Sequence, residues 1–148
     1  MYSLELFPET EVSTNGIRYE GRTYFSRSEL ACKGSGMVKL APSFADTLLE
    51  LRLIFDKPMV LTSACRTEEH NRRVGGHPRS LHICDFPPRE TGGCCAVDVR
   101  TSGQPPEYRE ELIQLARRLQ WSIGFGNGFL HLDRRIDYTD LPRAEFKY

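Results

Sequence analysis

The stretch WSIGFGNGFLHLD, residues 121–133, decides the fold of this chain because it predicts a β-hairpin. Two runs rich in apolar and aromatic residues, 121–125 and 129–133, flank a Gly-Asn-Gly turn at 126–128. Glycine and asparagine tolerate the left-handed backbone conformations that tight turns require. The stretch therefore predicts two antiparallel strands joined by a short turn.

The second strand of this hairpin has a polar face and an apolar face. Alternate side chains of a strand point the same way, so Leu130 and Leu132 share one face. Phe129, His131 and Asp133 share the other face. If the leucines pack against helices, His131 and Asp133 are held on a rigid floor on the opposite side of the sheet.

Two long amphipathic helices are predicted to cover the sheet. The first runs from Ser43, whose side chain can cap the first turn, to Phe55, and Pro105-Pro106 opens the second. Their apolar residues recur at helical spacing. The two stripes are Phe44, Leu48, Leu51 and Phe55, and Tyr108, Leu112, Leu115 and Leu119.

The other segments complete an α+β pattern. Ser26 and Glu29 form a predicted capping box. Strands are predicted at 58–63 and 94–99, a short helix with a loop at 67–76, a loop at 83–93, and a short hairpin or irregular cover over 1–25 with Asn15-Gly16 at a turn. We expect one domain over residues 1–148, with a small, mostly antiparallel sheet and helices packed on it.

Composition excludes several classes of function. Twenty basic and twenty acidic residues cancel, so no global positive field points to nucleic acid. No run approaches the roughly 20 apolar residues of a membrane span. The start, Met1 to Leu6, lacks the pattern of a secretory signal, so we expect synthesis in the cytoplasm. Five cysteines, two of them vicinal, favour reduced thiols over a disulfide framework.

His82, Asp98 and His131 are candidate ligands of a catalytic zinc ion. Two imidazoles and one carboxylate suit zinc, and three protein ligands leave a fourth position for water. Taken singly, each histidine could be a packed residue and Asp98 an ordinary ion-pair partner. Hiding all three in one sheet without a metal would leave costly polar burial, which favours the zinc site.

Other polar residues leave alternatives open. Thiolates from Cys84, Cys94 and Cys95 could hold a structural zinc instead, although their spacing does not match a Cys-x-x-Cys knuckle. His70 and His77 flank a Gly-Gly turn, where they could lie on the surface or touch a substrate.

Five short motifs, taken in order, resemble those of the M15 zinc peptidases over roughly residues 25–135. They are Ser63-Ala64-Cys65-Arg66, Val74-Gly75-Gly76, Ser80-Leu81-His82, Ala96-Val97-Asp98 and Phe129-Leu130-His131-Leu132-Asp133. The family comprises D-alanyl-D-alanine carboxypeptidases, dipeptidases and murein endopeptidases, and it shares its fold with the hedgehog signalling domain. Within it, the chain is most similar to the short peptidoglycan-cleaving enzymes of bacteria and tailed phages.

The resemblance implies roles for individual residues. Zinc would bind to His82, Asp98 and His131. Arg66 would bind or polarise a substrate carbonyl or carboxylate, because a guanidinium offers paired donors and keeps its proton. Ser80 would be a hydrogen-bonding neighbour of the site and contact the substrate.

The chain departs from the family pattern in two places. Sixteen positions separate His82 from Asp98, more than is usual in the family, and the inserted loop at 83–93 could act as a lid or specificity loop, or indicate a changed substrate. Gly128 and Phe129 stand where many relatives carry an acidic residue or histidine as general base. Asp133 is the remaining local candidate, either as catalytic base or as the carboxylate that orients His131.

The implied activity is zinc-dependent hydrolysis of amide bonds in peptidoglycan stem peptides or cross-links. A phage lysis or virion route, as for an endolysin, would bring such a product to the cell wall. The alternative is a catalytically inactive zinc-containing module that binds cell wall or protein, as the hedgehog relatives suggest.

Overall fold

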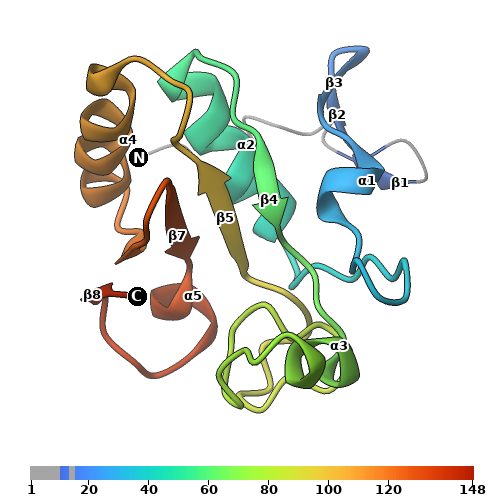
Figure 1. Ribbon diagram of the computed structural model, residues 1–148. Coiled ribbons are helices and arrows are strands. Elements are labelled where there is room, and N and C mark those ends of the chain that lie inside the picture. Colours follow the sequence, from blue (N-terminus) through green and yellow to red (C-terminus); the bar gives the residue numbers. More distant parts are fainter. Residues whose placement is uncertain (1–10, 14–15) are drawn as a thin grey trace.

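The computed structural model describes residues 11–13 and 16–148, and two β-sheets organise this part of the chain (Figure 1). The larger sheet has the strand order β4-β5-β7-β6-β8, antiparallel except for the parallel pair of β6 and β8. The smaller sheet is β1-β2-β3. The strands are β1 (Glu11–Ser13), β2 (Gly16–Tyr19), β3 (Arg22–Phe25), β4 (Leu61–Ser63), β5 (Ala96–Arg100), β6 (Ser122–Phe125), β7 (Phe129–Asp133) and β8 (Glu145–Lys147). The helices are α1 (Arg27–Leu30), α2 (Phe44–Phe55), α3 (Glu68–Arg73), α4 (Pro106–Arg118) and α5 (Arg135–Tyr138). This confirms the predicted α+β class.

The two long helices, α2 and α4, pack on the apolar face of the larger sheet. Their predicted stripes are buried in the same core as Leu130 and Leu132, except that Leu119 at the end of the second stripe is only partly buried. Leu130 and Leu132 are fully buried, and each contributes roughly 1.5–3 kcal/mol of hydrophobic stabilisation. Because side chains alternate along β7, burial of the leucines turns His131 and Asp133 to the opposite face, as predicted.

The helix α2 begins at Phe44, as predicted, but the predicted cap is wrong: the backbone of Ser43 is left-handed, with φ of 67°, and its side chain makes no capping hydrogen bond. The strand expected at 58–63 begins only at Leu61. Pro58 has no amide hydrogen to donate, and the amide of Leu61 donates to Glu29 Oε2 at 2.9 Å rather than to a strand. The strand expected at 94–99 is observed at 96–100.

Glu29 connects helix α1, which lies beside the smaller sheet, to the larger sheet. Its carboxylate completes the predicted capping box with Ser26 and also accepts the amide of Leu61 in β4. The N-terminal hairpin is confirmed by the antiparallel pairing of Val12 with Ile17, and a third strand joins it. Asn15 at its turn lies outside the described residues.

The last fifteen residues hold two elements that sequence reasoning did not predict, α5 and β8. Neither has an apolar periodicity long enough to be recognised, because each is only three or four residues long. In β8, Phe146 pairs with Gly124 of β6, where an added Cβ would lie 2.7 Å from the Phe146 ring. Gly124 therefore lets the C-terminal strand close against the sheet, next to His131.

The loop at 83–93 contains no helix or strand, as predicted, yet both of its ends are fixed. The amide of Cys84 donates to the carbonyl of Arg66 at 2.8 Å, and the amide of Cys94 donates to that of Lys39 at 2.9 Å. Within the described ranges, none of the helices combines the length and the apolar character that crossing a membrane requires.

Candidate metal centre

Two neighbouring strands and one turn bring the three predicted ligands together. Antiparallel pairing of β5 with β7 places Asp98 directly opposite His131. His82 lies outside any strand, in a turn whose geometry is fixed by two hydrogen bonds. Its amide donates to Ser80 Oγ at 3.2 Å, and its carbonyl accepts the amide of Arg66 at 2.9 Å. Ser80 thus positions His82 as well as facing the pocket described below.

The donor atoms of these three side chains converge on one point. His82 Nε2 and His131 Nδ1 each lie 3.1 Å from Asp98 Oδ1, and one ligand atom from each residue lies within 4.8 Å of the others. All three residues are buried, with exposed fractions of 1% for His82, 7% for Asp98 and 4% for His131. This group could hold a metal ion, as the sequence predicted.

The outer nitrogen of each imidazole is held by an acceptor. His82 Nδ1 lies 2.6 Å from the carbonyl oxygen of Ala64, and His131 Nε2 lies 2.7 Å from Asp133 Oδ2. Because a carbonyl and a carboxylate only accept, both outer nitrogens carry the proton. The inner nitrogens of neutral imidazoles then offer lone pairs toward Asp98. Three buried acceptors facing one point lack a donor, and a cation between them satisfies all three.

Asp98 is suited to the ionised state that a metal ligand requires. Burial raises the pKa of the Asp98 carboxyl group, but His82 and His131 lower it by more when their inner nitrogens carry protons, so the pKa lies well below its usual range. Asp98 Oδ2 also lies 3.5 Å from Arg66 Nη2. The carboxylate is therefore ionised at neutral pH.

Asp133 is fully buried and its carboxylate is occupied by several donors. Besides His131, it accepts two hydrogen bonds from the Arg135 guanidinium, at 3.0 and 2.7 Å, and one from the Arg135 amide at 3.0 Å. Burial raises the pKa of Asp133, but the hydrogen bonds from His131 and Arg135 lower it by a larger amount, so the pKa lies below its usual range. A carboxylate so held is a weak base. Its contacts favour the orienting role of the two that the sequence left open.

The guanidinium of Arg66 is fixed beside the donors by three contacts. Its Nε donates to Ser63 Oγ and its Nη1 to Asn71 Oδ1, both at 3.2 Å, while Nη2 faces Asp98. Asn71 is buried in α3, and its amide nitrogen donates to the carbonyl of His77 at 2.9 Å. Sequence reasoning missed Asn71, since a polar residue within a polar run carries no signal of its own.

Gly76 makes room for this arrangement. A Cβ at this position would lie 2.1 Å from Asn71 Oδ1 and 3.1 Å from Arg66 Nη1. A side chain there would displace the amide that orients Arg66. Lack of space beside Asn71 and Arg66 therefore explains why the second glycine of the Val74-Gly75-Gly76 motif, Gly76, carries no side chain.

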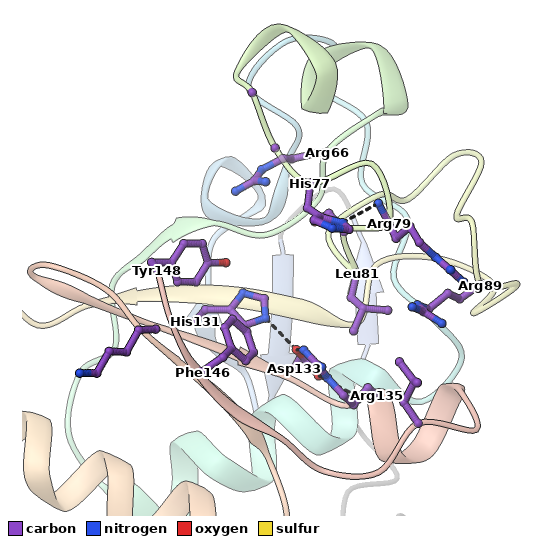
Figure 2. Close-up of a pocket in the computed structure, with 15 residues that line it drawn as sticks. Arg66, His77, Arg79, Leu81, Arg89, His131, Asp133, Arg135, Phe146 and Tyr148 are labelled. Atoms are coloured by element: carbon purple, nitrogen blue, oxygen red, sulfur yellow. Dashed lines mark hydrogen bonds and ion pairs between the residues drawn. The ribbon is translucent and has the colours of Figure 1, made fainter.

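A pocket of about 500 Å³ opens beside the donors (Figure 2). Its walls include the predicted residues Arg66, His77, Ser80, His131 and Asp133. His70 does not line it. Figure 2 shows Phe146, from β8, and Tyr148, which follows that strand, beside His131, with ring centroids 5.6 and 5.8 Å from its imidazole. Sequence reasoning missed both aromatic residues because they lie beyond the motifs.

The cysteines form no second metal site in the part of the chain that the structure describes. Cys84 and Cys94 are buried with Cys65 in a small apolar cluster, and the candidate metal group found among the described residues contains no thiol. Burial raises the pKa of Cys95 to about 12, so this thiol stays protonated at neutral pH. All five cysteines are free, in agreement with the expected reduced thiols.

Comparison with known protein families agrees with the geometry. A search of curated proteins finds no match for the chain. A family model described as Peptidase M15 matches residues 23–133, a span that contains the three donors, Arg66 and Asp133. Since the match covers well over half of its length, the chain belongs to the M15 family of peptidases, which are metallopeptidases.

Proposed function

We propose that this protein is a zinc-dependent peptidase that hydrolyses amide bonds in peptidoglycan stem peptides or cross-links. The observation that supports it most is the convergence of the buried side chains of His82, Asp98 and His131. The outer nitrogen of each imidazole is already hydrogen-bonded to an acceptor, which leaves the inner nitrogen for a metal. A zinc ion held by His82, Asp98 and His131 would keep one position for water, lower the pKa of that water and polarise the scissile carbonyl.

The neighbouring residues of the chain have separate tasks in this proposal. Arg66, fixed by Ser63 and Asn71, presents its remaining donor capacity to the carbonyl oxygen on which charge develops. Asp133 keeps His131 in the tautomer and orientation that the site needs. Ser80 holds the turn that carries His82 and offers its hydroxyl to the bound peptide.

The choice of zinc follows from the type of donor. Imidazole nitrogen and carboxylate oxygen together suit zinc, whereas calcium and magnesium prefer sites built wholly of oxygen. The peptidoglycan substrate rests on the likeness of the motifs to wall-cleaving members of the family. Delivery to the wall by a phage lysis or virion route is likewise part of the proposal.

One experiment tests metal, bond and activity together. Purified protein is analysed for bound metal and then incubated with peptidoglycan sacculi, with and without a chelator, and the released fragments are identified by mass spectrometry. We expect about one zinc per chain and new amine and carboxyl termini that chelation prevents. His82→Ala and Asp98→Ala should lose both the zinc and the cleavage. His70→Ala, outside the pocket, is the matched control and should keep both.

A second candidate is the inactive binding module, and one feature of the pocket favours it. Among the described residues that line the pocket, Asp133 alone carries a side-chain carboxylate that could act as a general base. This carboxylate is already hydrogen-bonded to His131 and Arg135. A module of this kind would bind zinc and sacculi but release no fragments. Sedimentation of the protein with sacculi, run beside the digest, separates the two functions.

A further inference from the structure

We propose that Arg79 and Arg89 form a second anionic subsite of the pocket, which binds a carboxylate of the peptide substrate away from the scissile bond. This inference rests on the proposed peptidase function and adds a substrate preference to it. The ligand class is a peptide with a free carboxylate, contributed either by an acidic residue or by its C-terminus.

The pocket has far more positive than negative charge. Its described lining carries four arginines and one lysine but one carboxylate, that of Asp133. Two of the arginines are already engaged, since Arg66 faces Asp98 and Arg135 binds Asp133. Within the described ranges, Arg79 and Arg89 make no side-chain hydrogen bond or ion pair. Two guanidinium groups are therefore left to meet a ligand.

Arg79 and Arg89 act as a pair because they lie on the same wall. Both line the main pocket, where Figure 2 shows them side by side, and both also line an adjoining outer groove. The outer groove contains the carboxylates of Glu90, Asp137 and Asp140, yet none of them pairs with the two arginines: Asp137 is bound by Arg134, and Glu90 and Asp140 make no ion pair among the described residues. Both guanidinium groups are therefore available to a ligand.

Local hydrogen bonds fix the main chain at both arginines. Arg79 lies in a turn where its amide donates to His77 Nδ1 at 3.0 Å. Arg89 lies in a turn closed by a hydrogen bond from the amide of Glu90 to the carbonyl of Pro87. Arg89 is partly buried, whereas Arg79 is exposed. An anion that binds Arg89 would therefore be partly shielded from water.

The chemistry of the remaining lining points to a peptide carboxylate. Guanidinium groups match a carboxylate with paired, charge-assisted hydrogen bonds. Leu81, Leu141 and Phe146 line the same pocket, so a ligand must present apolar groups beside its charge. An acidic peptide meets both requirements. The inserted loop, which carries Arg89, then acts as a specificity loop rather than as a passive insertion.

The test compares matched peptides. The zinc-loaded protein is assayed with four peptides that differ at two places: glutamate or glutamine within the sequence, and a C-terminal carboxylate or amide. We expect kcat/KM for an acidic peptide to exceed that of its neutral counterpart about tenfold or more, mainly through KM. Arg79→Gln and Arg89→Gln should each reduce this ratio, and the double variant should bring it close to one. Arg72→Gln, an exposed arginine of α3 outside the pocket, should leave the ratio as it is.

The four peptides identify the source of the carboxylate. A preference lost on glutamine substitution assigns the subsite to an acidic residue, and one lost on amidation assigns it to the C-terminus. Equal kcat/KM for all four peptides, or a preference that survives in the double variant, overturns the inference while the peptidase function stands. If no peptide is cleaved, calorimetric binding of the same peptides decides: tighter binding of acidic peptides that the double variant lacks supports the subsite, and equal binding overturns it.

Discussion

Asp133→Asn is the change that best separates the two roles of Asp133. The substitution keeps the size of the side chain and one acceptor oxygen but removes the charge. If the retained oxygen takes the Oδ2 position, it still accepts from His131 Nε2 and Arg135 Nη2, but the new NH2 group then faces the Nε and backbone amide of Arg135. In the opposite orientation the NH2 group faces His131, so in either case donors lose their acceptor in a site where Asp133 is fully buried.

The structure gives the size of the expected effects. Loss of a partner carboxylate behind a metal-binding histidine lowers metal affinity by about 10- to 100-fold. The side chain of Arg135 is only 18% exposed, so leaving its charge without a full partner costs about 1–3 kcal/mol of folding stability. For a domain of this size, that corresponds to a fall in Tm of about 3–9 °C.

The assay measures zinc affinity and peptidase rate separately. Zinc is titrated against a chelator of known affinity, and activity is then measured at saturating zinc. If Asp133 orients His131, the variant binds zinc more weakly but regains much of its rate at saturation. Unchanged zinc affinity with a rate reduced by about 10²-fold or more would refute this reasoning and make Asp133 the general base. Asp140→Asn, an exposed position without an ion pair among the described residues, is the control.

Three further predictions follow from other contacts. Gly76→Ala should lower kcat/KM by about tenfold or more with zinc binding retained, because the new methyl group displaces Asn71 and with it Arg66; steady-state kinetics and metal analysis test this. Glu29→Ala should lower the free energy of unfolding by about 1–3 kcal/mol, measured by urea denaturation, because the capping box and the partner of the Leu61 amide are lost together. Removal of zinc present at about 100 times its Kd should lower stability by about 2.7 kcal/mol, seen as a lower Tm.

Each of these predictions has a control and a contrary outcome. Gly75→Ala introduces backbone strain but meets no neighbouring atom, so an equal loss of kcat/KM there would attribute the effect to the backbone rather than to Arg66. Glu69→Ala breaks only an exposed pair with Arg73, and stability losses as large as those of Glu29→Ala would count against the cap. A Tm that chelation leaves unchanged in the wild type would argue against a bound metal.

Part of the fold was predictable because its signals are local. The spacing of apolar residues in α2 and α4 and the alternation in β7 are set by helix and strand geometry, and the structure confirms all three. The wrong predictions share a different origin. Ser43 fails to cap its helix because the chain enters α2 through a left-handed residue, and β4 begins at Leu61, whose amide donates to Glu29 of the distant helix α1. Such long-range contacts leave no periodic trace in the sequence.

The candidate site divides in the same way. The sequence alone determined which side chains can bind a metal, because donor chemistry belongs to residue type, and strand alternation put His131 and Asp98 on one face. Only the tertiary structure decided that His82 joins them, since a turn has no periodicity and its position depends on hydrogen bonds to the Ser80 hydroxyl and from the Arg66 amide. The tertiary structure also decided that the Arg135 guanidinium binds the Asp133 carboxylate, because contacts between side chains depend on packing in three dimensions.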